Sequence, residues 1–267
     1  MRAFEGRVDE SDLVCMREIL PSATATLTLK DPKYAGVDVV LGTVLPLTWP
    51  AMKREDGRVL LGMQTPQRSV DLSRDYAHAL LTALAAEPGD SFANIGEPDP
   101  DGPRLQDLLT DDALEVVCHL GFDWWLTETP EEGSPAAEAM QQANADVVPT
   151  EKLTSVQSAY WCRIGEKAHV RWARPEAEEP LLDALARLKA AGALELGAGS
   201  KFVGSFRALG LVVPVWDVAL ESSAASLEEP AAALAKHLDE ALANTSPLTT
   251  DERRARSEIL SRQLTLR

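Results

Sequence analysis

The same succession of patterns occurs twice in this chain: a turn between two apolar runs, followed by an amphipathic helical repeat. The first copy covers residues 45–84 and turns at Asp56-Gly57, and the second covers residues 159–188 and turns at Gly165. A glycine-containing turn between apolar runs is typical of a β-hairpin. We therefore predict an α+β fold in which antiparallel hairpins are covered by amphipathic helices, and we raise the hypothesis of two similar halves.

Capping residues and helix stops predict further elements. One helix begins at Ser11 and ends before Pro21, and another is opened by Ser134, because a serine side chain accepts hydrogen bonds from the first amides of a helix. Residues 202–217 predict one more hairpin. Residues 114–126, "LEVVCHLGFDWWL", are compatible with a strand pair or with a short helix.

The stretch "IGEPDPDGPR", residues 95–104, is built from proline, glycine and acids, which favour an extended connection. We place a domain boundary there. The predicted domains are an N-terminal α+β half at 1–95, a C-terminal α+β half at 105–220, and a helical extension at 224–267 packed on the second half. The last residues, "LTLR", form either an added strand or a loose tail.

The hairpin "SAYWCRIGEKAHVRWARPE" concentrates aromatic and basic side chains in an aromatic-poor chain. Because side chains alternate along a strand, Trp161 and Arg163 lie on one face of the first strand and their neighbours on the other face. In the same way, His169 and Arg171 share one face of the second strand. Packing by cross-strand stacking is the favoured interpretation. It would leave the guanidinium groups held by acids such as Glu176, Glu178 and Glu179. The alternative is a concavity that contains Trp161 and is bordered by Arg163, His169 and Arg171.

Candidate binding residues follow from these aromatic and basic clusters, and no catalytic residue is proposed. The candidates are Trp161, Arg163, His169, Arg171, Trp172, Trp124, Trp125 and Arg207. The glycine-rich "GAGSKFVG" lacks the order of a phosphate-binding loop, and the acids of 97–101 lack the final glutamate of a calcium loop. We therefore expect no metal and no cofactor.

Composition limits the partners. Twenty-six Lys and Arg against 42 Asp and Glu give a formal net charge of -16, which repels a phosphate backbone, so nucleic acid is disfavoured for this chain. Cys15, Cys118 and Cys162 are far apart, which predicts reduced thiols and no structural zinc. No apolar run approaches the roughly 20 residues that span a bilayer. We expect a cytoplasmic protein without a membrane partner.

Motifs along nearly the whole chain point to one known family. They are "RxFEG" at 2–6, "PSATA" at 21–25, "TVLPLTWPA" at 43–51, "AYWCRIGE" at 159–166, "FVGSFRALGLVVPVWD" at 202–217 and "RQLTLR" at 262–267. By these motifs the chain resembles an uncharacterised actinobacterial family of unknown function. Some members carry translocase-like or topoisomerase-like labels, which nothing in this sequence supports. The resemblance implies a basic N-terminal tail that is missing from this chain.

Three functions follow as hypotheses. The first is a non-enzymatic protein-interaction or scaffold module, because no complete catalytic constellation occurs. The second is an enzyme of unrecognised type that binds a small acidic metabolite near Arg163, His169 and Arg171. The third is association with RNA or the ribosome through the missing basic tail.

Overall fold

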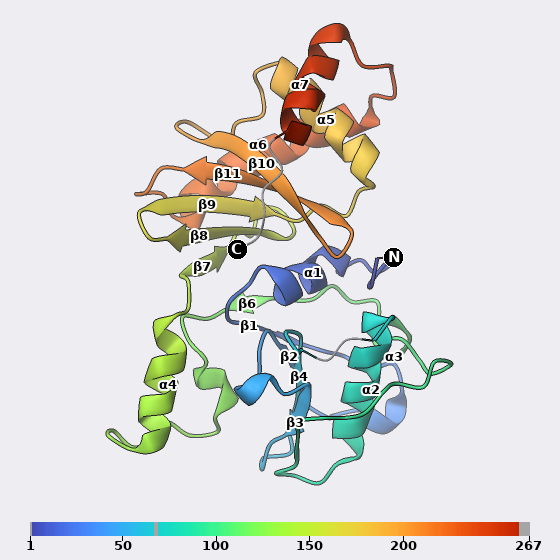
Figure 1. Cartoon of the computed structure of the whole chain (residues 1–267), viewed down its shortest axis with the longest axis vertical. Helices are drawn as coiled ribbons and strands as arrows, with labels where there is room; N and C mark the ends of the chain where they lie inside the picture. The colour runs from blue at the N-terminus through green and yellow to red at the C-terminus, as the bar shows by residue number, and fades with distance from the viewer. Residues whose placement is uncertain (1, 67–68, 262–267) are drawn as a thin grey trace. The chain divides into compact units, whose positions relative to one another are not determined.

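The computed structural model describes residues 2–66 and 69–261, and the chain divides into two compact units. One unit is formed by Arg2–Val148 and the other begins at Pro149. Each contains its own β-sheet with helices (Figure 1). The α+β class predicted from the sequence is therefore confirmed.

The division between the units differs from the predicted boundary at 95–104. That stretch is a connection within the first unit: beyond it, strand β6 (Val117–Cys118) pairs antiparallel with β1 (Ala23–Thr26), which lies far earlier in the chain. Proline, glycine and acids do predict an irregular backbone there. They carry no information on whether the following chain returns to the same sheet, and here it does.

The sheet of the first unit is mixed. Its strand order is β5-β3-β4-β2-β1-β6, and β2 and β4 pair in parallel while the other pairs are antiparallel. The inner strands carry apolar runs such as "VVLG" and "VLLG", as expected for strands within a sheet. The remaining strands are β2 (Val39–Gly42), β3 (Ala51–Lys53), β4 (Val59–Gly62) and β5 (Ser91–Phe92).

Helix α2 (Leu72–Ala85) packs on strands β3 and β4 through an apolar face that includes Tyr76, Leu80 and Ala83. Its N-cap is Asp71, whose side chain accepts from the Ser73 amide. The other helical elements of this unit are α1 (Glu10–Glu18), α3 (Leu105–Leu108), α4 (Pro135–Ala145) and the 3-10 turns η1 (Pro32–Tyr34), η2 (Pro46–Thr48) and η3 (Asp123–Trp125).

The sheet of the second unit is entirely antiparallel, in the order β10-β11-β9-β8-β7. Its aromatic face forms one hydrophobic core with α5, α6 and α7. The predicted C-terminal helices are confirmed, and both pack on α5. The elements are β7 (Thr150–Lys152), β8 (Ala159–Ile164), β9 (Lys167–Trp172), α5 (Glu178–Ala190), β10 (Lys201–Ala208), β11 (Leu211–Val218), α6 (Ala224–Ala243) and α7 (Thr250–Ser261).

The two copies of the hairpin and helix pattern have the same order of elements in different surroundings. β3 and β4 form an antiparallel hairpin followed by α2, and β8 and β9 form one followed by α5. The neighbour of β4 is the parallel strand β2, whereas the neighbour of β9 is the antiparallel strand β11. A common origin of the two halves stays a hypothesis.

Within residues 2–66 and 69–261, no helix combines the length and the apolar character needed to cross a membrane. The C-terminal "LTLR" considered as an added strand lies outside the described residues.

Candidate functional site

The register of the aromatic hairpin separates the residues that the sequence suggested as one site. Ile164 pairs with Lys167, so the turn has two residues. Arg163 is then opposite Ala168, whereas His169 is opposite Cys162 and shares a face with it. The proposed concavity is therefore wrong: Arg163 and His169 point to opposite faces. Alternation shows which residues of one strand share a face. The length of the turn sets the register, and the register decides which face of the first strand lies beside which face of the second.

The two tryptophans of the hairpin belong to the core of the second unit. Trp161 is 8% exposed and Trp172 is 1% exposed, in one cluster with leucines of α5 and α6. The indole N–H of Trp172 donates to the Gln157 carbonyl, 2.9 Å away. Neither ring offers a surface to a ligand.

Two of the basic candidates in the second unit, His169 and Arg207, bind different acids. His169 Nδ1 lies 2.8 Å from Asp217 Oδ1, and the Arg207 guanidinium binds the Glu178 carboxylate, with Nε to Oε2 at 2.9 Å. Arg163 is exposed and Arg171 half-buried.

The acids expected to hold the hairpin arginines bind other partners. Glu176 pairs with Arg174, Glu178 with Arg207 and Glu179 with Arg256. The hydrogen bond from Arg207 holds the pKa of Glu178 below its usual value, against the opposing effect of burial.

Residues 119–126 of the first unit carry a second aromatic cluster, which stays partly open to solvent. Phe122 stacks on Trp125 with ring centroids 4.4 Å apart, and Trp124 meets Trp125 edge-on at 6.0 Å. Both tryptophans lie in η3 and are half-buried. A strand would have placed them on opposite faces, whereas in the 3-10 turn their rings meet edge-on.

Strand β2 contacts the Trp124 ring at Gly42. A Cβ atom added at Gly42 would lie 2.3 Å from the Trp124 ring atom Cη2, so only glycine fits beneath the indole. The indole N–H donates to Ser22 Oγ at 3.0 Å. Burial lowers the pKa of the neighbouring His119, with Asp123 opposing, and its Nε2 lies 2.8 Å from Thr24 Oγ1.

Two further bonds hold the aromatic segment. The indole N–H of Trp125 donates to the Val44 carbonyl at 2.8 Å, and Arg54 Nη1 donates to the Leu126 carbonyl at 3.2 Å. Arg54 also binds Asp56 at 2.5 Å. Burial alone would raise the pKa of Asp56, but hydrogen bonds from Arg58 and Arg54 outweigh it and hold that pKa low.

The loop that contains Val44, residues 43–50, has a strained apex and is called the Leu47 loop below. Leu47 and Thr48 have φ values of 54° and 57°, in the left-handed region that disfavours residues with a Cβ. Leu47 is 80% exposed. The loop is nevertheless fixed, because the Thr48 amide donates to the Leu45 carbonyl at 2.9 Å and the Trp49 amide to the Pro46 carbonyl at 3.1 Å.

Sequence reasoning did not single out Leu47. The sequence feature that could have indicated this residue is "PLTWP", in which a leucine lies between Pro46 and Pro50. Two prolines predict a constrained loop, but not that the enclosed leucine faces solvent.

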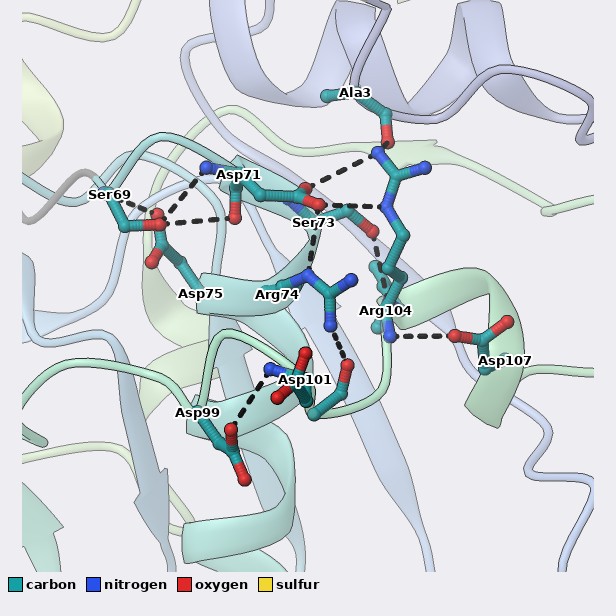
Figure 2. Close-up of polar contacts among 12 residues, drawn as sticks. Ala3, Ser69, Asp71, Ser73, Arg74, Asp75, Asp99, Asp101, Arg104 and Asp107 are labelled. Atoms are coloured by element: carbon teal, nitrogen blue, oxygen red, sulfur yellow. Dashed lines mark hydrogen bonds and ion pairs between the residues drawn. The ribbon is translucent and has the colours of Figure 1, made fainter.

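A polar cluster around Asp71 is the other dense arrangement of charges in the first unit (Figure 2). Its carboxylate receives Arg74 Nε at 3.2 Å and Arg104 Nε at 3.1 Å, and Arg104 also donates to the Ala3 carbonyl at 3.2 Å. The arrangement ties α2 to α3. Asp99, one of the acids of 97–101 that do not complete a calcium loop, accepts the Asp101 amide at 2.9 Å.

The described part of the chain, 2–66 and 69–261, contains no group of three or more His, Cys, Asp or Glu placed to hold a metal ion. The Leu47 loop combines an exposed apolar apex with a fixed backbone, and the bond from Trp125 to Val44 joins it to the aromatic segment.

Comparison with known proteins assigns a family. A family model described as a family of unknown function, DUF5926, matches residues 3–267. No curated protein and no solved structure matches the chain. Because the match covers nearly the whole sequence, the chain belongs to this family.

Proposed function

We propose that this member of the DUF5926 family is a protein-interaction module that binds a partner protein through the Leu47 loop. The observation that carries the proposal is the exposure of Leu47, at 80%, on two successive left-handed residues. Both features oppose folding of the isolated chain. Backbone strain of this kind costs of order 1–3 kcal/mol per residue and is concentrated at functional positions.

Burial of Leu47 in a partner would offset this cost. Transfer of a leucine side chain from water to an apolar pocket contributes about 1.5–3 kcal/mol. The turn hydrogen bonds at Thr48 and Trp49 fix the apex before binding, so little loop entropy is lost on association. Half-buried Trp125 lies beside the loop through its bond to Val44, and tryptophan is enriched at interface centres.

The surface favours a protein partner over the other two hypotheses. Its apex is an aliphatic side chain, which offers neither a donor to an acidic metabolite nor a charge to a phosphate backbone. The enzyme hypothesis rested on convergence of Arg163, His169 and Arg171, and the hairpin register places Arg163 on the opposite face.

A Leu47→Gly variant separates binding from folding. Glycine accepts φ near +54° without strain, so the melting temperature should stay equal or rise, while the apolar apex is lost. The amount of each protein captured from a lysate of the source cells is measured in a quantitative pull-down with the wild-type and the variant chain. The captured partner is then purified, and its affinity for each chain is measured by calorimetry.

The matched control is Leu220→Gly, which removes another exposed leucine. We expect the partner to bind wild type and Leu220→Gly equally, and Leu47→Gly at least about 30-fold more weakly, as for a hot spot of about 2 kcal/mol. Equal capture of every protein by all three chains would overturn the proposal.

A further inference from the structure

We infer that a pocket between α2, α3 and the segment 29–34 binds a small amphipathic carboxylate, such as a medium-chain fatty acid. The cavity has a volume of about 330 Å³, at the low end of the roughly 300–1,000 Å³ of small-molecule pockets. Its lining consists of four half-buried leucines, called the floor below, and of exposed charged groups with one tyrosine, called the mouth. The lining residues are Leu29, Leu81, Leu84, Leu108, Lys30, Lys33, Tyr34, Asp31 and Asp107.

The floor of the pocket is formed before any ligand arrives. Leu29 bridges to Leu109, and the Lys30 amide donates to the Leu108 carbonyl at 2.8 Å. These bonds fix two walls against each other. The third wall is α2, which contributes half-buried Leu81 and Leu84 in addition to the buried face that packs on the sheet.

All four leucines of the floor are only half-buried. They come from three separate segments and converge on one cavity, which leaves apolar surface that a chain of methylene groups would cover. At about 25 cal/mol per Å², this burial provides the driving force for an apolar tail.

The mouth of the pocket supplies cations with unused capacity. Lys30 Nζ donates to the Gln106 carbonyl at 3.1 Å and lies 3.9 Å from an Asp111 carboxylate that is 93% exposed. An ammonium has three donors, so Lys30 can also bind a ligand carboxylate. Lys33 lies 4.6 Å from the centre of the Tyr34 ring.

The acids at the mouth already have partners. Asp31 accepts the Lys33 amide at 3.0 Å and pairs with its ammonium at 2.9 Å. The carboxylate of Asp107 accepts the Arg104 amide at 2.8 Å. Because Lys33 is paired with Asp31, the Lys30 ammonium is the group to which we assign the ligand carboxylate, in a chain whose net charge is -16.

The test is calorimetry with decanoate below its micellar concentration, compared with decanol and decyltrimethylammonium. We expect saturable binding of decanoate, with decanol weaker by about 10-fold and the cation weaker still. Leu84→Trp fills the cavity and should abolish binding. Lys30→Gln should weaken decanoate about 10-fold and leave decanol unchanged, whereas Lys236→Gln should change neither.

Amide chemical shifts locate the ligand independently of the variants. Decanoate should perturb residues 29–34, 81–84 and 107–108. Absence of saturable binding, equal affinity for the three probes, or unchanged binding by Leu84→Trp would each overturn the inference. Leu47→Gly should bind decanoate normally, so this result and the partner experiment can fail separately.

Discussion

The two aromatic clusters use similar contacts and end in different environments. In the second unit, Phe202 and Trp216 meet edge-on at 5.5 Å, and the Trp216 indole donates to the Leu194 carbonyl at 2.7 Å. In the first unit, Phe122 and Trp125 stack at 4.4 Å, and the Trp125 indole donates to the Val44 carbonyl at 2.8 Å. Yet Trp216 is 1% exposed, while Trp125 is half-buried.

The difference is in what covers the rings. Helices α5 and α6 contribute an apolar face each to the core around Trp216. Trp125 is held by a loop carbonyl and by the neighbouring rings of η3. Aromatic density in a sequence therefore indicates where a chain packs tightly. Whether the packed rings serve stability or recognition depends on the elements that cover them.

The largest expected effect is on the covered cluster. Trp216→Ala should lower the free energy of unfolding by about 3–5 kcal/mol, because a large buried ring leaves a cavity and the Leu194 carbonyl loses its donor. Trp125→Ala should cost less than half as much. Urea unfolding followed by circular dichroism measures both. A similar loss for the two variants would break the comparison.

Gly42→Ala tests the contact between strand β2 and the aromatic cluster of the first unit. The new Cβ would overlap the Trp124 ring, and overpacking of this kind typically costs about 1–3 kcal/mol. We expect a loss in that range, with a change in tryptophan fluorescence. The double variant Gly42→Ala with Trp124→Phe removes the overlapping ring atoms, so it should lose less than the sum of the single changes. Strict additivity would contradict the contact.

Local elements were largely predictable from the sequence, because turns and caps depend on neighbouring residues. The turns at Asp56-Gly57 and Gly165, and the helix opened by Ser134, lie where the pattern indicated. The start of the first helix differs slightly from the prediction: α1 begins at Glu10 with Asp9 at its N-cap, instead of at Ser11.

The candidate site was predictable only in part. Trp124 and Trp125 were identified as binding candidates by residue type, but the exposure of Leu47 depends on the backbone conformation of its loop. The convergence of Leu29, Leu81 and Leu108 depends on long-range pairing. Neither a positive φ nor a bridge across 80 residues is encoded in a local pattern.

Trp125→Phe isolates the hydrogen bond that joins the exposed cluster to the Leu47 loop. The ring stays apolar but can no longer donate to the Val44 carbonyl, so stability should fall by about 1 kcal/mol. Partner affinity should fall by more than this, because the loop loses its support. Affinity and stability measured on the same preparation decide the point. Equal losses would assign Trp125 a purely structural role.

The smallest expected effect concerns helix α6, which packs over the buried aromatic cluster of the second unit. Glu228 of α6 accepts the Thr154 and Ser155 amides at 2.8 and 2.7 Å, which fastens the helix to the connection between β7 and β8. Burial alone would raise the pKa of Glu228, but hydrogen bonds from Ser155 and Thr154 outweigh it and lower the pKa to about 2.

A depressed carboxyl pKa stabilises the folded chain at high pH. The contribution of Glu228 should be fully present above its ordinary pKa of 4.5 and should be lost as the pH falls towards about 2. Because the group is accessible to solvent, Glu228→Gln should cost at most about 1 kcal/mol at pH 7. The difference in unfolding free energy between wild type and variant should shrink between pH 4.5 and pH 2. If the difference is independent of pH, the carboxylate charge does not hold α6 over the ring of Trp216.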